Sequence, residues 1–416
     1  MTLRSAVVTL AVTPVLLAAQ ARAIPSDAPI TRALEALRAE NAWTLEQQRT
    51  ICEVPAPPFA EHTRALEVQR RFRALGFADA RIDSIGNVLA EYRGSALGPT
   101  IVLAGHLDTV FPEGTDVRVK VTGTRMAGPG IGDDCRGLAV VMAVGRQLQM
   151  QKIPIAGRII LVANVGEEGN GNLRGTRFLY DRELKDAIDH FISVDGTGSG
   201  IVHRAVGSTR YRVTFKGPGG HSYGAFGMPN PIHAMGRAIA TISDIAVPRE
   251  PKTTFNVGIV NGGTSVNSIA FEASMEIDMR SEDVAALDAT DAKITAAIFA
   301  ARDAERARWP QSSKALDVVI DTLGIRPTGP AVPIGGPLVA TALAAGRAVG
   351  FAPTTDASST DANIPIGRGK SGIEIDGGGD GGGGHSLSEW YDDGADGWKG
   401  PQWALLLVTA LARGGR

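Results

Sequence analysis

The sequence of 416 residues holds only two cysteines, Cys52 and Cys135. Two cysteines are too few for a disulfide scaffold or for a zinc site built from thiolates. Positive and negative charges nearly balance, because the sequence has 42 Lys and Arg residues and 44 Asp and Glu residues, giving a net charge of −2. This balance argues against a protein that binds nucleic acid by neutralising phosphates. Cys135 is interpreted as a small buried side chain, and a disulfide between the two cysteines stays open.

Long apolar runs are also scarce, and the clearest one lies at the N-terminus. Arg4 precedes an apolar run from Ala6 to Ala19, and Ala21-Arg22-Ala23 follows it. A basic start, an apolar stretch and an A-x-A site are the features of a secretory signal peptide. The run is shorter than the roughly 20 residues that span a bilayer, and Pro14 interrupts it. We therefore expect residues 1–23 to be cleaved near Ala23, leaving a periplasmic or secreted protein without a stable membrane anchor.

The pattern of strands and helices after the signal segment predicts two domains, one inserted into the other. Apolar runs such as Arg158 to Asn164 are typical of buried parallel strands, and helical stretches alternate with them. From about Gly207 the order changes to β-α-β-β-α-β, which is typical of a ferredoxin-like α+β unit. The expected architecture is an α/β domain with a mostly parallel sheet, formed by residues 24–206 and 328–416. A smaller α+β domain at residues 207–327 interrupts it.

The predicted elements follow from hydrophobic periodicity and from proline and glycine stops. Helices are expected at Ile30 to Glu53, His62 to Leu75, Arg136 to Met150, Pro231 to Ile245 and Val284 to Arg308. Strands are expected at Thr100 to Ala104, Arg158 to Asn164, His190 to Val194, Arg210 to Phe215, Thr253 to Val260, Ile269 to Met279 and Leu316 to Asp321.

Acidic and imidazole side chains gather where these strands end. The set comprises His106, Asp108, Glu167, Glu168 and Asp195 after strands, Asp133 before a helix and His385 after a glycine-rich stretch. Ligands of an open α/β sheet bind beyond the carboxyl ends of its strands, so these side chains are expected to converge. Clustered carboxylates repel one another unless cations neutralise them, which favours a metal site.

The mixture of ligands fits two divalent metals that share one carboxylate. Such a pair, about 3.5–4 Å apart, lowers the pKa of bound water towards about 7. A carboxylate that is not a ligand then acts as general base, and two adjacent glutamates supply one ligand and one base. Each spacing alone occurs often by chance, whereas their ordered combination is specific.

In this combination the sequence resembles the co-catalytic zinc peptidases and deacylases. This family includes peptidase T, glutamate carboxypeptidase, acetylornithine deacetylase and succinyl-diaminopimelate desuccinylase. The resemblance covers nearly the whole mature chain. The motifs that carry it are Gly105-His-Leu-Asp-Thr-Val110, Gly132-Asp-Asp-Cys-Arg-Gly137, Glu167-Glu168, Val194-Asp-Gly196, Ser358-Ser-Thr-Asp-Ala-Asn363 and Gly384-His-Ser386.

The resemblance implies two bound Zn²⁺ ions, with Co²⁺ or Mn²⁺ as alternatives because nitrogen and oxygen ligands discriminate poorly among them. Asp133 would bridge the two metals, and the peptide bond after it is typically cis in the family. His106 and Asp195 would complete one site, and Glu168 and His385 the other.

The same resemblance assigns two further carboxylates. Glu167 would be the general base. Asp108 would hydrogen-bond His106 and fix its tautomer. The position of Asp195 takes either Asp or Glu in the family, and Asp looks more like the di- and tripeptidases.

The inserted domain resembles the lid through which the family dimerises, so we expect a homodimer formed through residues 207–327. His221, in Gly219-Gly-His-Ser222, would reach the partner's active site and stabilise the oxyanion. Asn267 and Arg280 would hold polar groups of the substrate, and the Arg fork suits a carboxylate.

Together these observations predict metal-dependent hydrolysis of an amide bond in small peptides, by a di- or tripeptidase or another exopeptidase. An N-acyl-amino-acid deacylase or a carboxypeptidase of the same mechanism is the main alternative. A serine hydrolase is a remote alternative, because Gly220-His-Ser222-Tyr-Gly224 matches G-x-S-x-G and Asp361 and His385 follow in order. A peptide-binding relative without activity is another, but such relatives lose ligands or the base, and this chain has them all.

Glycine, finally, is abundant, at 51 of 416 residues, against a usual share of about 7%. Many glycines flank the proposed ligands, which indicates turns that place those side chains. The glycine-rich run from Gly377 to Gly384 is the best candidate for a loop that contacts substrate.

Overall fold

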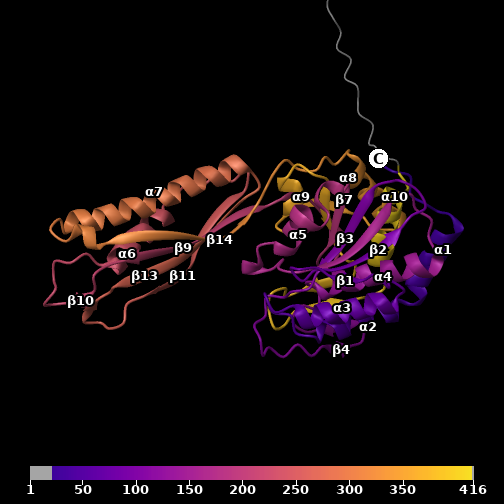
Figure 1. Ribbon diagram of the computed structural model, residues 1–416, viewed down its shortest axis with the longest axis horizontal. Coiled ribbons are helices and arrows are strands. Elements are labelled where there is room, and N and C mark those ends of the chain that lie inside the picture. The colour runs from indigo at the N-terminus through magenta and orange to yellow at the C-terminus, as the bar shows by residue number, and fades with distance from the viewer. Residues whose placement is uncertain (1–20, 415–416) are drawn as a thin grey trace, which may run out of the picture.

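A computed structural model describes residues 21–414 of the chain, and these form two lobes joined by extended segments (Figure 1). The apolar run of the expected signal peptide lies outside the described residues. Within residues 21–414, no helix is both long enough and apolar enough to cross a membrane.

The larger lobe is built on an eight-stranded sheet in the order β1-β2-β6-β3-β7-β16-β8-β15. Its neighbouring strands β6, β3, β7 and β16 run parallel to one another, and β15 runs parallel to β8. The expectation of an α/β fold with a mostly parallel sheet is confirmed. The strands are β1 (Arg81–Ile82), β2 (Val88–Arg93), β3 (Thr100–His106), β6 (Arg158–Asn164), β7 (His190–Val194), β8 (Gly200–Ala205), β15 (Thr354–Ser358) and β16 (Gly372–Ile375).

Helices cover both faces of this sheet. One face packs against α1, α4, α8 and α10 in the main hydrophobic core, and the other face packs against a smaller cluster near α5 and α9. The helices are α1 (Ala28–Ala39), α2 (Asn41–Cys52), α3 (His62–Ala74), α4 (Cys135–Gln151), α5 (Arg174–Phe178), α8 (Pro337–Ala348), α9 (Asn363–Gly367) and α10 (Lys399–Arg413). Short turns of helix lie at η1 (Gly169–Gly171), η2 (Leu179–Glu183), η3 (Lys185–Ala187) and η4 (Ser313–Ala315).

The smaller lobe contains a four-stranded antiparallel sheet in the order β11-β13-β9-β14. Helices α6 and α7 pack on one face of it and form a separate core with Phe215, Ile277 and Ile298. The order of elements is the β-α-β-β-α-β order expected from the sequence. The elements are β9 (Gly207–Lys216), α6 (Pro231–Ser243), β11 (Thr253–Gly262), β13 (Glu272–Ser281), α7 (Val284–Arg308) and β14 (Asp317–Arg326).

Two elements that were predicted to be continuous are each divided in the structure. The helix expected from Ile30 to Glu53 breaks at Glu40. The apolar spacing did not reveal the break, because both halves pack on the same core. The strand expected from Ile269 to Met279 is also divided. Its first part, β12 (Ser268–Ile269), pairs with β10 (Gly220–His221) outside the main sheet of the lobe.

A small four-stranded sheet was not predicted, and it positions the C-terminal glycine-rich segment. Its order is β17-β18-β5-β4, and the turn between β17 and β18 carries His385. Its strands are β4 (Lys120–Thr122), β5 (Arg125–Ala127), β17 (Asp380–Gly382) and β18 (Trp390–Asp392).

Cys52 and Cys135 form a disulfide, with their Cα atoms 5.4 Å apart. It joins the end of α2 to the start of α4, directly after the Asp133–Asp134 segment. Cys135 is buried, as interpreted, and the disulfide that the sequence left open is present. Periodicity did not reveal the pair, because 83 residues separate the two cysteines along the chain.

Candidate active site

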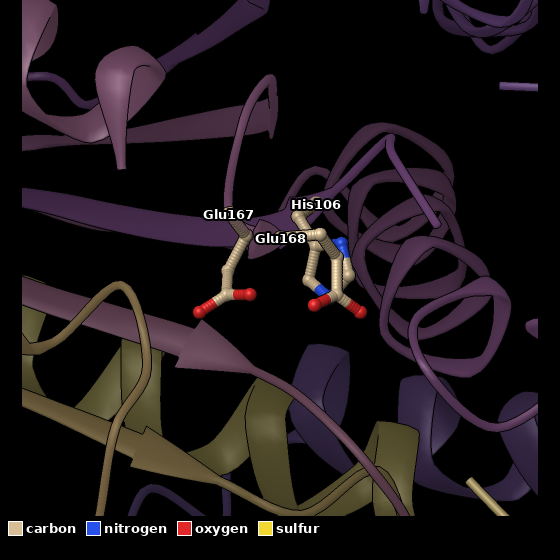
Figure 2. A group of neighbouring side chains, drawn as sticks. All are labelled: His106, Glu167 and Glu168. Carbon is tan, nitrogen blue, oxygen red and sulfur yellow. The ribbon is translucent and has the colours of Figure 1, made fainter. Parts of the chain in front are cut away.

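Three neighbouring parallel strands deliver the candidate ligands to one edge of the large sheet. His106 is the last residue of β3, Glu167 and Glu168 follow β6, and Asp195 follows β7. Figure 2 shows the side chains of His106, Glu167 and Glu168 pointing in the same direction. Ligand atoms of these three residues lie within 4.8 Å of one another.

Asp133 lies between the two histidines. Its Oδ1 is 2.9 Å from Nε2 of His106, and its Oδ2 is 3.1 Å from Nε2 of His385. Asp195 Oδ1 is 3.9 Å from the same nitrogen of His106, and Glu168 Oε1 is 3.1 Å from that of His385. The side chains therefore form two candidate ligand groups that share Asp133, in the arrangement that the family resemblance implies.

The chemistry of these contacts fits bound cations. Nδ1 of His106 faces the backbone carbonyl of Asp108 at 2.9 Å. If Nδ1 carries the proton, Nε2 is an acceptor, and it faces acceptor oxygens of Asp133 and Asp195. Two acceptors this close repel each other unless a proton or a metal ion lies between them. Separations of 2.9–3.9 Å also bracket the roughly 3.3 Å expected between ligands of a tetrahedral zinc ion.

Asp108 has a different role from the one implied by the resemblance. Its backbone carbonyl, and not its carboxylate, contacts the ring of His106, and the nearest carboxylate oxygen is 3.8 Å away. The fully buried carboxylate instead accepts hydrogen bonds from the backbone N–H groups of Glu167 at 3.1 Å and Glu168 at 2.8 Å. Asp108 therefore fixes the turn that presents both glutamates.

Two further acids hold the segment that carries Asp133, and neither was predicted. Glu389 accepts hydrogen bonds from the backbone N–H groups of Gly130, Gly132 and Asp133 at 2.8–3.0 Å. Asp134 caps α4 and also accepts from the N–H of His106 at 2.8 Å. The Asp133–Asp134 peptide bond is cis, as the resemblance implies.

Glu167 pairs with Arg326, the last residue of β14. Nη1 of Arg326 is 2.8 Å from Oε1 of Glu167, and Nη2 also donates to the backbone carbonyl of Glu167. Both side chains are buried. Burial raises the pKa of Glu167 to about 8, and the positive charge of Arg326 opposes that rise. The sequence analysis did not predict Arg326. Its position at the junction of the two predicted domains is the one feature of the sequence that could have indicated a role at the site.

The candidate ligands open onto a cavity of about 670 Å³. Arg280, predicted to contact substrate, lines this cavity together with Arg210 and Arg326. His385 lines it as well, but none of the glycines from 377 to 384 does. Gly378 and Gly379 pack instead against Gly400 and the ring of Tyr391, where a Cβ atom would come within 3 Å of its neighbours.

His221 and Asn267 lie elsewhere, in the smaller lobe. Both are exposed, and β10 and β12 bring them together at the end of the lobe that is remote from the large sheet (Figure 1). Within one chain they do not meet the candidate ligands.

The serine triad considered above is not assembled within residues 21–414. Ser222 follows β10 in the remote part of the smaller lobe. Asp361 is buried in the larger lobe, where it accepts hydrogen bonds from Asn164 and from the hydroxyl of Thr176, both at 2.6 Å.

Comparison with protein families gives two matches. Residues 204–303 match the peptidase dimerisation domain, and residues 87–216 match peptidase family M28. The predicted relationship to the co-catalytic metallopeptidases is confirmed. The M28 match contains six of the eight predicted acids and histidines of the site, and the dimerisation match contains His221, Asn267 and Arg280.

Two curated proteins are similar to this chain at the sequence level. Carboxypeptidase G2 from Pseudomonas sp. is 28% identical over 225 residues, which are 51% of this chain and 53% of that protein. A probable succinyl-diaminopimelate desuccinylase from Staphylococcus aureus is 26% identical over 230 residues, covering 47% of this chain and 56% of that protein. The chain thus matches a little over half the length of these relatives.

Solved structures show the same fold over nearly the whole chain. A tripeptidase from Staphylococcus aureus superposes with a TM-score of 0.71 at 22% identity, covering 89% of this chain and 98% of the other. Aminopeptidase PepT from Bacillus cereus gives a TM-score of 0.69 at 22% identity with the same coverage.

Proposed function

We propose that this chain hydrolyses an amide bond in small peptides with the help of two divalent metals, and that these are zinc. The observation that carries the proposal is the position of Asp133 between His106 and His385, with Asp195 and Glu168 completing the two groups. No ligand of the predicted set is missing from the described site, and Glu167 remains beside it as a base. These features favour activity over a purely binding role.

The side chains divide the chemistry among them. When bound, the metals supply Lewis acidity and lower the pKa of water. Glu167 takes a proton from the attacking water and returns it to the leaving amine. Burial raises the pKa of this carboxyl to about 8 in the metal-free chain. Nearby divalent cations would favour its ionised form, which is the form that a general base needs. Arg326 holds Oε1 of Glu167, which leaves the other oxygen for the proton.

The arginines of the cavity suit a substrate with a carboxylate. Arg280 lines the cavity and contacts Asp278 through Nε, and the Nη atoms of a guanidinium can bind a carboxylate. His221 and Asn267 would serve the active site of a second chain, because both are exposed and remote from their own. The matched dimerisation domain supports a homodimer through residues 207–327.

A deacylase or carboxypeptidase with the same mechanism is the second candidate. The arginine-lined wall favours it, because N-acyl amino acids and C-terminal residues both carry a free carboxylate. The curated relatives include a carboxypeptidase and a probable desuccinylase, whereas the structural neighbours include a tripeptidase and an aminopeptidase. Cobalt or manganese would suit the same nitrogen and oxygen ligands.

We further propose that the chain acts in the periplasm or outside the cell, after cleavage near Ala23. The N-terminal pattern of residues 1–23 motivates this proposal. The Cys52–Cys135 disulfide supports it, because structural disulfides persist mainly in oxidising compartments.

A chelation experiment with a substrate panel tests the proposal. The panel contains free dipeptides, N-blocked dipeptides, C-blocked dipeptides and N-acyl amino acids. We expect a chelator to abolish hydrolysis and zinc to restore it, while a serine-directed reagent has no effect. Activity that survives chelation but is lost to the serine reagent would contradict the proposal. The pattern of accepted substrates separates aminopeptidase, carboxypeptidase and deacylase.

A further inference from the structure

Two acids of the cavity lie outside both ligand groups. Glu374 belongs to β16 and Asp376 follows it, and both line the same cavity as Asp195 and His385. Glu374 is only 4% exposed. Neither residue belongs to a motif of the family resemblance, and β16 reads in sequence as an ordinary buried strand.

The sheet places these acids next to the ligand groups. Glu374 pairs with Ser193 of β7 in parallel register, and Ser193 precedes the candidate ligand Asp195 by two residues on the same strand face. Adjacent strands lie about 4.8 Å apart and alternate residues about 6.7 Å apart. The backbone of Glu374 is therefore about 8 Å from that of Asp195. Along the sheet edge, β6, β3 and β7 carry metal-ligand candidates, and β16 carries the next acids.

The carboxylate of Glu374 lacks a partner. Its Oε1 is buried with no hydrogen-bond partner among the described residues, and the same holds for Oγ of Ser193 beside it. Asp376 accepts a hydrogen bond from the N–H of Gly200. Burial raises the pKa of Glu374, and the neighbouring Asp376 adds to that rise. A buried carboxyl without a partner stays protonated, and a cation that binds beside it would favour the ionised form.

The cations that line the cavity are already engaged with other acids. Nε of Arg210 and Nε of Arg280 lie 2.8 Å and 2.7 Å from the two oxygens of Asp278. Arg326 is paired with Glu167. The cavity lining contains no lysine. Within the described structure, Glu374 and Asp376 therefore have no cationic partner, although each of the three arginines has an acid.

Glycines leave space around this pair. A Cβ atom at Gly198 or Gly200 would come within 3.0 Å of Oδ2 of Asp376, so the segment after Asp195 admits the carboxylate only because side chains are absent there. The N–H of Gly200 then holds Asp376 at the wall of the cavity. Glu374 and Asp376 are therefore part of the cavity wall.

We propose that Glu374 and Asp376 form a subsite for a cationic group of the substrate, an ammonium or a guanidinium, next to the Asp195 side of the metal ligands. This inference rests on the proposed function and names its substrate class. The preferred substrates carry a positive charge near the scissile amide, either as a free N-terminal amine or as a basic side chain. Arg280 contacts Asp278 through Nε and offers its Nη atoms to the carboxylate at the other end of the substrate.

Four matched peptides test the subsite on the zinc-loaded full chain. They are Lys-Ala and norleucine-Ala, each with a free and with an acetylated N-terminus, so that side-chain charge and α-ammonium charge vary separately. We expect wild type to prefer the charged member of one pairing by about 10- to 100-fold in kcat/KM, the range of a hydrogen bond to a charged group. A preference that follows lysine assigns the cation to the side chain. A preference that follows the free terminus assigns it to the α-ammonium.

Isosteric variants test whether Glu374 and Asp376 cause the preference for charged peptides. E374Q should bring the ratio of kcat/KM for charged and neutral peptides close to one by slowing hydrolysis of the charged peptide. D376N provides a second, independent removal of charge should E374Q unfold. D288N is the matched control, because Asp288 on α7 is exposed and does not line the cavity, and it should keep the wild-type ratio.

Two results would overturn the subsite. One is equal kcat/KM for charged and neutral peptides in wild type. The other is an unchanged preference in both E374Q and D376N. Failure of the proposed function looks different, because then no peptide is cleaved with or without zinc. In that event calorimetric binding of the same four peptides decides the subsite by itself, and equal affinities would refute it.

Discussion

Arg326 donates from Nη1 to Oε1 of Glu167 at 2.8 Å, and this contact joins the last strand of the smaller lobe to the candidate general base. The same nitrogen also donates to the hydroxyl of Ser359 at 3.1 Å. The relationship makes the protonation of Glu167 depend on a residue of the inserted domain. Domain arrangement and chemistry are thereby linked through one side chain.

Removal of the charge at Arg326 should change the pH dependence of hydrolysis. The guanidinium lowers the pKa of Glu167 against the effect of burial. In R326M that pKa rises, so the acidic limb of the kcat/KM profile should move to higher pH by about one unit. R326K keeps a positive charge and should move the limb less. A lower profile with an unmoved limb would mean that Arg326 has only a structural role.

Loss of the base should separate metal binding from turnover. E167Q keeps the shape of the side chain, and Glu167 is not needed in either ligand group that shares Asp133. We expect two metals per chain by elemental analysis and a decrease in kcat of about 10²- to 10⁴-fold. Near-normal turnover in this variant would disprove the assignment of the base.

A substitution at Asp108 distinguishes its observed role, holding the turn of Glu167 and Glu168, from the expected role of hydrogen-bonding His106. D108N cannot accept two backbone N–H bonds equally well, because one of its carboxylate oxygens becomes an NH₂ donor. The turn of Glu167 and Glu168 should loosen, with a metal affinity about 10- to 100-fold weaker, mainly at the site of Glu168 and His385. Selective weakening at the site of His106 instead would favour the originally expected carboxylate–imidazole contact.

Metal-free protein should lose stability as the pH rises. Burial raises the pKa of Glu167 from 4.5 to about 8, so the folded chain binds this proton more tightly than the unfolded chain. Its contribution is complete below about pH 4.5 and disappears as the pH approaches 8. His385 acts in the same direction between 6.5 and about 10, because hydrogen bonds to Asp133 and Glu168 raise its pKa.

The measurement is thermal unfolding in a chelator across this range. We expect the Tm to fall by about 5 °C or more between pH 5 and pH 8. Zinc should remove most of the decline, since bound metal replaces the protons. A Tm that is flat or rises with pH in the chelator would show that the buried acids do not have raised pKa values in the folded chain.

Much of the site follows from short sequence patterns, and the exceptions have physical causes. His106, Glu167 and Asp195 end adjacent parallel strands, so strand prediction alone brings them together. The direction of Asp108 did not follow, because position after a strand does not say whether the carbonyl or the carboxylate of a residue faces its neighbour. The motif fixes residue identity but leaves the hydrogen bonds open.

Long-range partners account for the rest of what sequence did not reveal. Arg326 lies 159 residues from Glu167, and Glu389 lies 257 residues from Gly132, whose backbone it holds. Only the packing of the folded chain brings such groups together, and the local periodicity of the sequence does not predict these contacts. Glu374 was missed for a different reason, since one acid between Ile373 and Ile375 resembles any half-buried strand.

The number of metals bound per chain tests the central claim most directly. Metal-free protein is titrated with zinc and followed by calorimetry and elemental analysis, for wild type and for H106A, H385A and D133N. The account predicts two zinc ions for wild type, one for each histidine variant, and weakened binding at both sites for D133N, because Asp133 faces both histidines. A single ion in wild type, or two tightly bound ions in D133N, would contradict it.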